Sequence, residues 1–183
     1  MRVPRDTIIS LTPDGDLVPG AGQGAVGLWP FTQSRRLLRR SVAPRLLDPV
    51  NLLVLRADPD SVRQMLERQG WARPDDGATH RTWIAGRFLL MSDHIALGTR
   101  AERVHARLFR LGEVTLIAAH HEVADGGGRH HVTSWDRGRA ATAAALEAAG
   151  AARIAATAVI TPVDLRGVPG DGRVWRLVVD PPR

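Results

Sequence analysis

The fold is decided by the sequence RVHARLFRLGEVTLIAAHHEV, which occupies residues 103–123. Residues 103–110 and 113–123 are both rich in β-branched and apolar residues, as strands are. The dipeptide Leu111-Gly112 between them is a hairpin signal, so we expect two antiparallel strands joined by a two-residue turn.

That turn places Arg110 opposite Glu113, and the alternation of side chains along both strands then separates two faces. In a two-layer fold one face lies under helices and the other is open to solvent. We expect the apolar set to lie under helices: Val104, Ala106, Leu108, Ile117 and Ala119. The other set mixes imidazole, guanidinium and apolar groups and is expected to form an open contact surface: Arg103, His105, Arg107, Phe109, Val114, Leu116, Ala118 and His120. In the alternative interpretation, arginine stems, a dimer or the N-terminal segment cover this face and it has no function.

Upstream of the hairpin, residues 50–55 form a nearly continuous apolar run, which is typical of a strand buried on both faces. Asp58 is a helix N-cap with Pro59 at the first helical position. The helix is expected to end at Gly70, with Trp71 making the apolar contact of a Schellman ending. These signals therefore predict one strand and one helix before the hairpin.

Downstream of the hairpin, residues 134–149 are predicted to form a helix, and residues 153–161 and 173–179 two strands. A stripe of small side chains on this helix is expected to approach the sheet closely: Ala141, Ala144, Ala145 and Ala148. Residues 79–91 fit either a short helix or an irregular insertion. The order predicts an α+β fold, a two-layer ferredoxin-like (split βαβ) antiparallel sheet with two helices on one face and an additional C-terminal strand.

The composition of the chain excludes several classes of site. The 183 residues are 44% hydrophobic and include no cysteine, so a disulfide framework, a thiolate metal site and a cysteine nucleophile are all excluded. All 25 basic residues are arginine, which weakens the arginine count as a sign of nucleic-acid binding. The apolar runs are too short for a membrane span and no signal peptide is visible, so we expect a cytoplasmic protein.

The positive charge is concentrated near the N-terminus. Residues 1–47 carry seven arginines and three aspartates and are expected to be a basic, partly irregular extension of an α+β domain at residues 48–183. Four arginines interleave with leucines as in a short amphipathic basic helix: Arg35, Arg36, Arg39 and Arg40. Such a helix either packs on the domain or binds an anionic membrane surface, which would place the protein at the periphery of the inner membrane.

Histidine is the main chemical resource of the chain, with copies at positions 80, 94, 105, 120, 121, 130 and 131. His105 and His120 fall on the mixed face, diagonally across the hairpin, and a glycine loop could return His130-His131 to the same strand end. These four histidines are the candidate ligands of a zinc ion, with Glu122 or Asp136 nearby. Neighbouring residues on a strand point to opposite faces, so only one histidine of each pair can serve the site. Anion binding or proton transfer by His105 and His130, and plain surface histidines, are the alternatives.

Four segments resemble the C-terminal domain of the LssY proteins, over roughly residues 47–180. They are LDPVNLLV at 47–54, QGW at 69–71, RVHARLF at 103–109 and RHHV at 129–132. The resemblance implies a bacterial protein related to domains attached to membrane proteins with phosphatidic-acid-phosphatase-like helices, a family without an established activity. It carries over three positions of unknown role, His105, Arg107 and His130. The chain departs from the family pattern at Val104 and Phe109, where the family tends to have His and Trp. It also has Thr133-Ser134-Trp135 in place of an acidic run, which argues against transferring a metal or acid–base role.

Three functional classes follow from these residues. The leading one is a non-catalytic or accessory binding domain whose Arg/His-rich face binds an anionic small molecule or protein partner: Arg103, His105, Arg107, His120 and His130. The second is a metal- or histidine-dependent enzyme acting on a phosphate-bearing or other anionic substrate, with Arg107 as its anchor. The third is an RNA-binding sheet, which needs two or three stacking aromatic residues where the face offers Phe109 alone. Nucleic acid is therefore not an expected partner, whereas a homo-oligomer is compatible with the mixed face.

Overall fold

The computed structural model describes residues 9–11, 17–19, 31–33, 50–74, 81–84, 87–159, 163–165 and 168–180. In these ranges the elements are β1 (Ile9–Leu11), β2 (Leu17–Pro19), β3 (Phe31–Gln33), β4 (Leu52–Leu55), α1 (Pro59–Glu67), β5 (Arg81–Ile84), β6 (Arg87–Gly98), β7 (Glu102–Leu111), β8 (Val114–Ala124), β9 (His130–Ser134), α2 (Trp135–Ala148), β10 (Ala152–Val159), β11 (Val163–Leu165), β12 (Val168–Gly170) and β13 (Arg173–Val178). The prediction of a mixed α+β fold is confirmed. The segment 79–91, for which a helix or an insertion was considered, contributes β5 and the start of β6.

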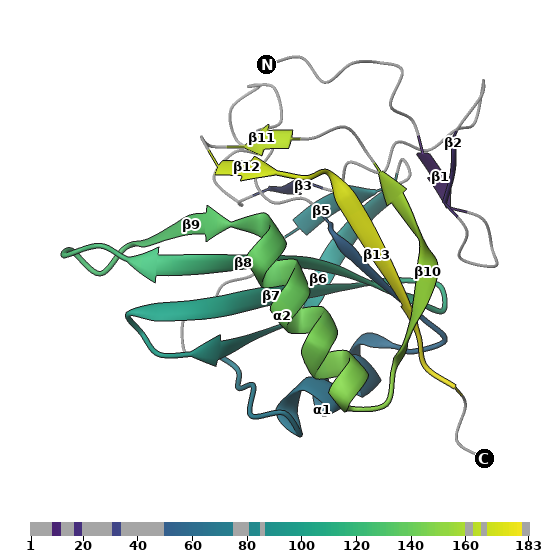
Figure 1. Cartoon of the computed structure of the whole chain (residues 1–183), viewed down its shortest axis with the longest axis horizontal. Coiled ribbons are helices and arrows are strands. Elements are labelled where there is room, and N and C mark those ends of the chain that lie inside the picture. The colour runs from purple at the N-terminus through teal and green to yellow at the C-terminus, as the bar shows by residue number, and fades with distance from the viewer. Residues whose placement is uncertain are drawn as a thin grey trace.

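The described strands form one large sheet in the order β10-β13-β4-β8-β7-β6-β5-β3, with β9 paired to the far half of β8. β4 runs antiparallel to β8 on one side and parallel to β13 on the other. Helix α2 lies across β7 and β8, whereas β10 and β13 run steeply across the direction of those strands (Figure 1). Helix α1 packs against α2, β6 and β7, so both helices cover the same face of the sheet.

Both helices end in the same way. In α1 the backbone N–H groups of Gly70 and Trp71 donate to the carbonyls of Glu67 and Leu66, which is the Schellman pattern, and α2 repeats it at Gly150. Gly70 has a φ of +82°, a conformation that favours glycine. The predicted ending of the first helix is confirmed, as is its N-cap, where the Asp58 carboxylate accepts a hydrogen bond from the backbone N–H of Ser61 at 2.7 Å.

The predicted apolar face of the hairpin is confirmed. It packs with residues of α1 and α2 in the main core: Leu52, Val54, Val62, Met65, Leu66, Trp71, Val104, Ala106, Leu108, Ile117, Ala119, Ala143 and Leu146. The turn itself is a correction, because Leu111 pairs with Val114 and the turn is Gly112-Glu113. Leu111 stays in the strand since it packs on an apolar cluster, while Gly112, at a φ of +59°, takes the turn. The shift preserves which face each residue occupies but changes its cross-strand partner.

The predicted alanine stripe of α2 is half right: Ala141 and Ala145 pack against the core, whereas Ala144 and Ala148 are exposed. The residue that allows close approach is Gly138, where an added Cβ would lie 2.3 Å from the Cα of His120. The buried side of α2 is instead made by Trp135, Gly138, Arg139, Thr142, Ala143 and Leu146. The helix therefore rests on the backbone of β8 at the position that carries His120.

The second face of the sheet is not open to solvent, which corrects the expectation of an open contact surface. Phe109, Leu116 and Ala118 are fully buried, and His105, Arg107 and His120 are also buried. A second apolar cluster joins residues of β4, β7, β8 and β13 to Met91 and Ile154 on this face. The sheet has more strands than expected, and residues of β4, β6, β7, β8, β10 and β13 pack together on this face.

Two expectations concern the N-terminal segment, most of which lies outside the described residues. Arg35, Arg36, Arg39 and Arg40 lie outside the described residues, so the basic helix and its membrane contact stay predictions. Part of the N-terminal segment is described, because β3 pairs with β5 at the edge of the large sheet. None of the described helices has the length and apolar character needed to cross a membrane.

Candidate functional site

The polar side chains of the second face stand in three neighbouring rows across β6, β7 and β8. The cross-strand partners are Gly98, Arg103 and Glu122 in one row, Ala96, His105 and His120 in the next, and His94, Arg107 and Ala118 in the third. His105 lies directly opposite His120, not diagonal to it, because of the corrected turn. Regular strand pairing thus concentrates histidine, arginine and glutamate side chains on a few adjacent positions.

Three of these side chains form a compact buried group, which we call the interior cluster: His105, His120 and Glu122. The Nε2 atom of His120 is 3.0 Å from Oε2 of Glu122, and Nδ1 of His105 is 3.9 Å from Oε1 of the same carboxylate. One nitrogen or oxygen from each residue lies within 4.8 Å of the others. The three side chains are 1–6% exposed, so the interior cluster is shielded from water.

Glu122 is held in its charged form despite its burial. Burial alone raises the pKa of a carboxyl group, but the hydrogen bond and charge of His120, together with His105 and Arg103, hold the pKa of Glu122 well below its usual range. Arg103 forms an ion pair with the Oε1 atom through its Nε. The interior cluster therefore contains a fixed negative charge between a guanidinium group and two imidazoles.

His105 is the least satisfied member of the interior cluster. Neither ring nitrogen has a hydrogen-bond partner among the described residues, although the side chain is 3% exposed. Burial, and then the neighbouring charge of His120, lower the pKa of His105 to about 3, so its imidazole is neutral at physiological pH. A buried polar group without a partner costs about 1–3 kcal/mol, which makes this ring a candidate ligand-binding group.

The rings around His105 form a continuous row. His94 and His105 meet edge to face with ring centroids 5.3 Å apart, His105 and His120 at 5.2 Å, and His120 and Trp135 at 5.8 Å. His94 was not selected as a site candidate from the sequence, where it shows no pattern of partners. Its position opposite Arg107 depends on a bulge in the β6–β7 pairing, which the sequence does not announce.

The prediction that each histidine pair sends only one ring to the site agrees with the structure. His130 points inward, with Nδ1 3.9 Å from Oε1 of Glu122 and Nε2 2.8 Å from the backbone carbonyl oxygen of Arg100. His131 points outward, where its Nε2 lies 2.9 Å from Asp125, and it is not brought to the interior cluster. His121 turns to the helix-covered side and contacts Glu102. Of the six described histidines, the four that gather on the second face are therefore His94, His105, His120 and His130.

A pocket of about 600 Å³ opens beside the interior cluster. Three arginines and His130 line it together with small residues: Ala72, Arg73, Pro74, Ala96, Gly98, Thr99, Arg100, Arg103, Gly128 and His130. None of these lining residues is acidic. Arg103 and His130 belong both to the pocket and to the surroundings of Glu122, so they connect solvent with the interior cluster.

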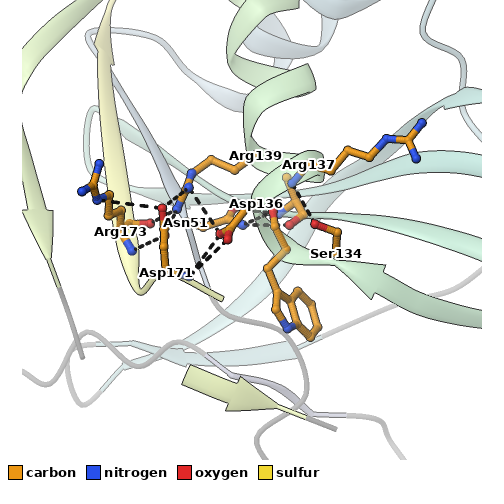
Figure 2. A network of polar contacts seen from close by, with 9 residues as sticks. Asn51, Ser134, Asp136, Arg137, Arg139, Asp171 and Arg173 are labelled. Carbon is orange, nitrogen blue, oxygen red and sulfur yellow. Dashed lines mark hydrogen bonds and ion pairs between the residues drawn. The ribbon is translucent and has the colours of Figure 1, made fainter. Parts of the chain in front are cut away.

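A second polar network lies at the start of α2 and is built, apart from Asp136, from residues that were not selected from the sequence as site candidates (Figure 2). Buried Arg139 holds Asp171 through two hydrogen bonds, of 2.6 and 2.7 Å, and also donates to the backbone carbonyl oxygen of Arg173 at 2.6 Å. Asp136, once considered as a metal ligand, belongs here, 3.3 Å from Arg139. Asn51 bridges β8 and α2 by bonding both backbone groups of Ala119 and the carbonyl oxygen of Trp135.

This second network joins distant segments of the chain and raises the pKa of Asp136. Burial and the nearby Asp171 charge raise the pKa of Asp136 against the opposing effect of Arg139, whereas the hydrogen bonds from Arg139 lower the pKa of Asp171. The network fixes the loop before β13 to the first turn of α2. We therefore assign it a structural role.

The chain was compared with known proteins in three ways. It matches no protein-family model, no curated protein and no solved structure. Function has to be argued from the geometry of the chain itself.

Proposed function

We propose that the protein is a binding domain for a small anionic ligand, and that the receptor is the arginine-lined pocket beside the interior cluster. The observation that carries the proposal is the composition of the pocket wall, in which three arginines and a histidine occur without any acidic residue. The face expected to bind such a ligand is buried, so its accessible part is the end where Arg103 and His130 reach the pocket.

Arg100 is the strongest candidate for direct contact with the ligand. It is exposed, and no carboxylate among the described residues forms an ion pair with it. The other two arginines are already oriented by acidic partners, Arg73 by Asp93 and Arg103 by Glu122. Guanidinium groups donate paired hydrogen bonds that match phosphate and carboxylate oxygens.

The size of the pocket fits a small molecule. A volume of about 600 Å³ lies within the range of roughly 300–1,000 Å³ that is typical of ligand pockets. Small side chains form part of the wall, at Ala72, Ala96 and Gly98, so a compact group can approach the backbone there. A monophosphate or dicarboxylate is the class of ligand that these features favour.

The test is calorimetric titration of the full chain with inorganic phosphate at low ionic strength, followed by Arg100→Gln. We expect about tenfold weaker phosphate binding in this variant, because one charge-assisted contact of about 1.5 kcal/mol is lost. Arg129→Gln is the matched control, since Arg129 is exposed close to the pocket but does not line it. Equal losses of phosphate affinity in the two variants would show that the effect comes from net charge alone and would contradict the pocket as the binding site.

A second candidate function is an enzyme acting on a phosphate-bearing substrate, and the position of His130 favours it. This imidazole lines the pocket and lies 3.9 Å from Glu122, a separation that allows a proton to be exchanged after a small side-chain movement. Hydrolysis of a generic phosphomonoester, p-nitrophenyl phosphate, tests it. Turnover that is lost in His130→Ala supports an enzyme, and absence of turnover in the unaltered protein rejects this candidate for that substrate class.

We also propose that the centre of the sheet is a split βαβ unit made of β4, α1, β7, β8, α2 and β10. The order β10-β4-β8-β7 supports it once β13 is treated as an added strand between β10 and β4, and β5–β6 as a hairpin inserted before β7. Relationship to the LssY C-terminal domain is likewise a proposal, supported by the segments quoted for the resemblance. Two of the three carried-over positions, His105 and His130, contact the carboxylate of Glu122.

A further inference from the structure

We propose that His105, His120 and Glu122 form a binding site for a divalent transition-metal ion of the zinc type. The proposal is independent of the anion pocket, because it concerns the buried interior cluster and not the pocket wall. Its geometric basis is the register of β7 and β8, which sets two imidazoles in one row and a carboxylate in the next.

The donor atoms suit this class of metal. Imidazole nitrogen and carboxylate oxygen are ordinary zinc ligands, and two histidines with one glutamate make a set that leaves a position open for water or a ligand. A tetrahedral zinc site with bonds of about 2.0–2.1 Å places its ligand atoms roughly 3.3 Å apart. The three donors already lie within 4.8 Å of one another, so rotations of the side chains are enough to close the site.

The burial of His105 supplies an independent reason for a ligand. Both of its ring nitrogens lie in the interior without a hydrogen-bond partner among the described residues. A bound cation would satisfy one of them directly, whereas none of the described side chains or backbone groups does.

The surroundings support the carboxylate as a ligand. Arg103 contacts Oε1 of Glu122, while Oε2 accepts the hydrogen bond of His120 at 3.0 Å. Partners of this kind orient metal ligands in proteins and influence affinity. On metal binding the ion would replace the hydrogen bond between His120 and Glu122. The coordinating nitrogen of His120 would give up its proton, from an imidazolium to solvent or from a neutral ring to the other ring nitrogen, and each residue would donate a lone pair to the ion. The pocket with His130 and Arg103 provides the route by which an ion enters.

The experiment uses the full chain, freed of metal by a chelator and titrated with Co²⁺ and then Zn²⁺. We expect one Co²⁺ per chain with visible absorption bands of a tetrahedral ion, displaced by Zn²⁺. His105→Gln and Glu122→Gln should each weaken binding by about 100-fold or more, since they remove a direct ligand. His131→Ala is the matched control, because that histidine is exposed and lies outside the interior cluster, and it should leave binding unchanged.

The outcomes separate this proposal from the anion pocket. Arg100→Gln should weaken phosphate binding but leave the cobalt spectrum intact. His105→Gln should abolish the cobalt spectrum but leave phosphate binding, measured without metal, unchanged. Circular dichroism and the unfolding transition confirm that each variant is folded. Absence of stoichiometric binding in the unaltered protein, or binding that survives in folded His105→Gln and disappears in His131→Ala, would overturn the interior site.

Discussion

The interior cluster and the network around Arg139 are both buried groups of charged residues, yet they differ in how completely they are satisfied. Both terminal nitrogens of Arg139 are engaged by Asp171, Asp136 and a backbone carbonyl group, and its Nε alone lacks a hydrogen-bond partner among the described residues (Figure 2). In the interior cluster both ring nitrogens of His105 lack partners among the described residues. The Arg139 network therefore pairs its charge with partners within the chain, which indicates a structural role, whereas His105 has two ring nitrogens that a ligand can still bind.

The difference predicts opposite effects when each group is replaced. Removal of a satisfied ionic residue leaves its partners uncompensated and is strongly destabilising. Replacement of an unsatisfied buried polar group by an apolar one of similar shape is neutral or stabilising. The following experiments use the free energy of unfolding of the metal-free protein as the measured quantity, starting with the largest expected change.

Arg139→Ala should have the largest effect. It removes the cation that Asp136 and Asp171 share, leaves Asp171 with only the exposed Arg173 at 3.9 Å, and frees the loop before β13 from α2. We expect a loss of about 3 kcal/mol in urea unfolding, near the low end for buried pairs because both carboxylates are partly exposed. The matched control is Arg137→Ala, two positions earlier in the chain. It removes an exposed ion pair with Glu102 and should change the free energy of unfolding by less than about 1 kcal/mol. Similar losses in both variants would contradict a structural role specific to Arg139.

Gly138→Ala tests the contact that joins the two regions, since this glycine precedes Arg139 and touches the backbone of His120. The added Cβ would lie 2.3 Å from the Cα of His120, so α2 must move away from β8. We expect a loss of about 2 kcal/mol. Gly126→Ala introduces the same methyl group where no atom lies within 4 Å, and thermal unfolding of the two variants should differ clearly. An unchanged Gly138→Ala protein would show that the helix does not rest on the strand there.

Acidification should destabilise the folded protein through His105. Its pKa is lowered to about 3 by burial and then by the His120 charge, whereas an unfolded histidine titrates near 6.5. Between these values the unfolded chain binds more protons than the folded chain, so stability falls as the pH falls. From pH 6.5 to pH 5 this residue contributes a loss of about 2 kcal/mol. Urea titrations at several pH values across that range should measure a loss of unfolding free energy that is smaller by this amount in His105→Leu. In His131→Ala the loss should be the same as in the unaltered protein.

The smallest change concerns His105→Leu at pH 7. Because the imidazole has no hydrogen bond to lose among the described residues, the metal-free variant should be as stable as the unaltered protein or about 1 kcal/mol more stable. This sign is opposite to that of Arg139→Ala. A loss of several kcal/mol, measured by urea unfolding, would show that His105 is satisfied in solution and that the contrast between the two regions is wrong.

Local patterns in the sequence were sufficient for the faces of the hairpin. Alternation assigns His105 and His120 to the face away from the helices, and this assignment survives the corrected turn because the register changed by an even step. The same parity also places Glu122 with His120, a signal that could have identified the third member of the interior cluster. Helix capping by Asp58 and the ending at Gly70 were predicted for the same reason, since both depend on neighbouring residues.

Long-range features were not accessible in this way. The apolar part of the second face is buried because β13 inserts beside β4 and because residues of β6 and β10 join the same cluster, and neither arrangement leaves a local pattern. Arg139 meets Asp171 across 32 positions of sequence, so no spacing rule connects them. The one available sign was Gly138 in the first turn of the predicted helix, where a glycine is less favourable than an alanine unless close packing requires it.

The central claim is that the interior cluster is a ligand site and not a self-contained structural group. Anomalous diffraction from crystals of the full chain soaked in Zn²⁺ tests it most directly. The account predicts a zinc peak within about 2.0–2.1 Å of one nitrogen of His105, one nitrogen of His120 and one oxygen of Glu122. An interior with no peak, while zinc occupies surface histidines such as His131, would contradict it.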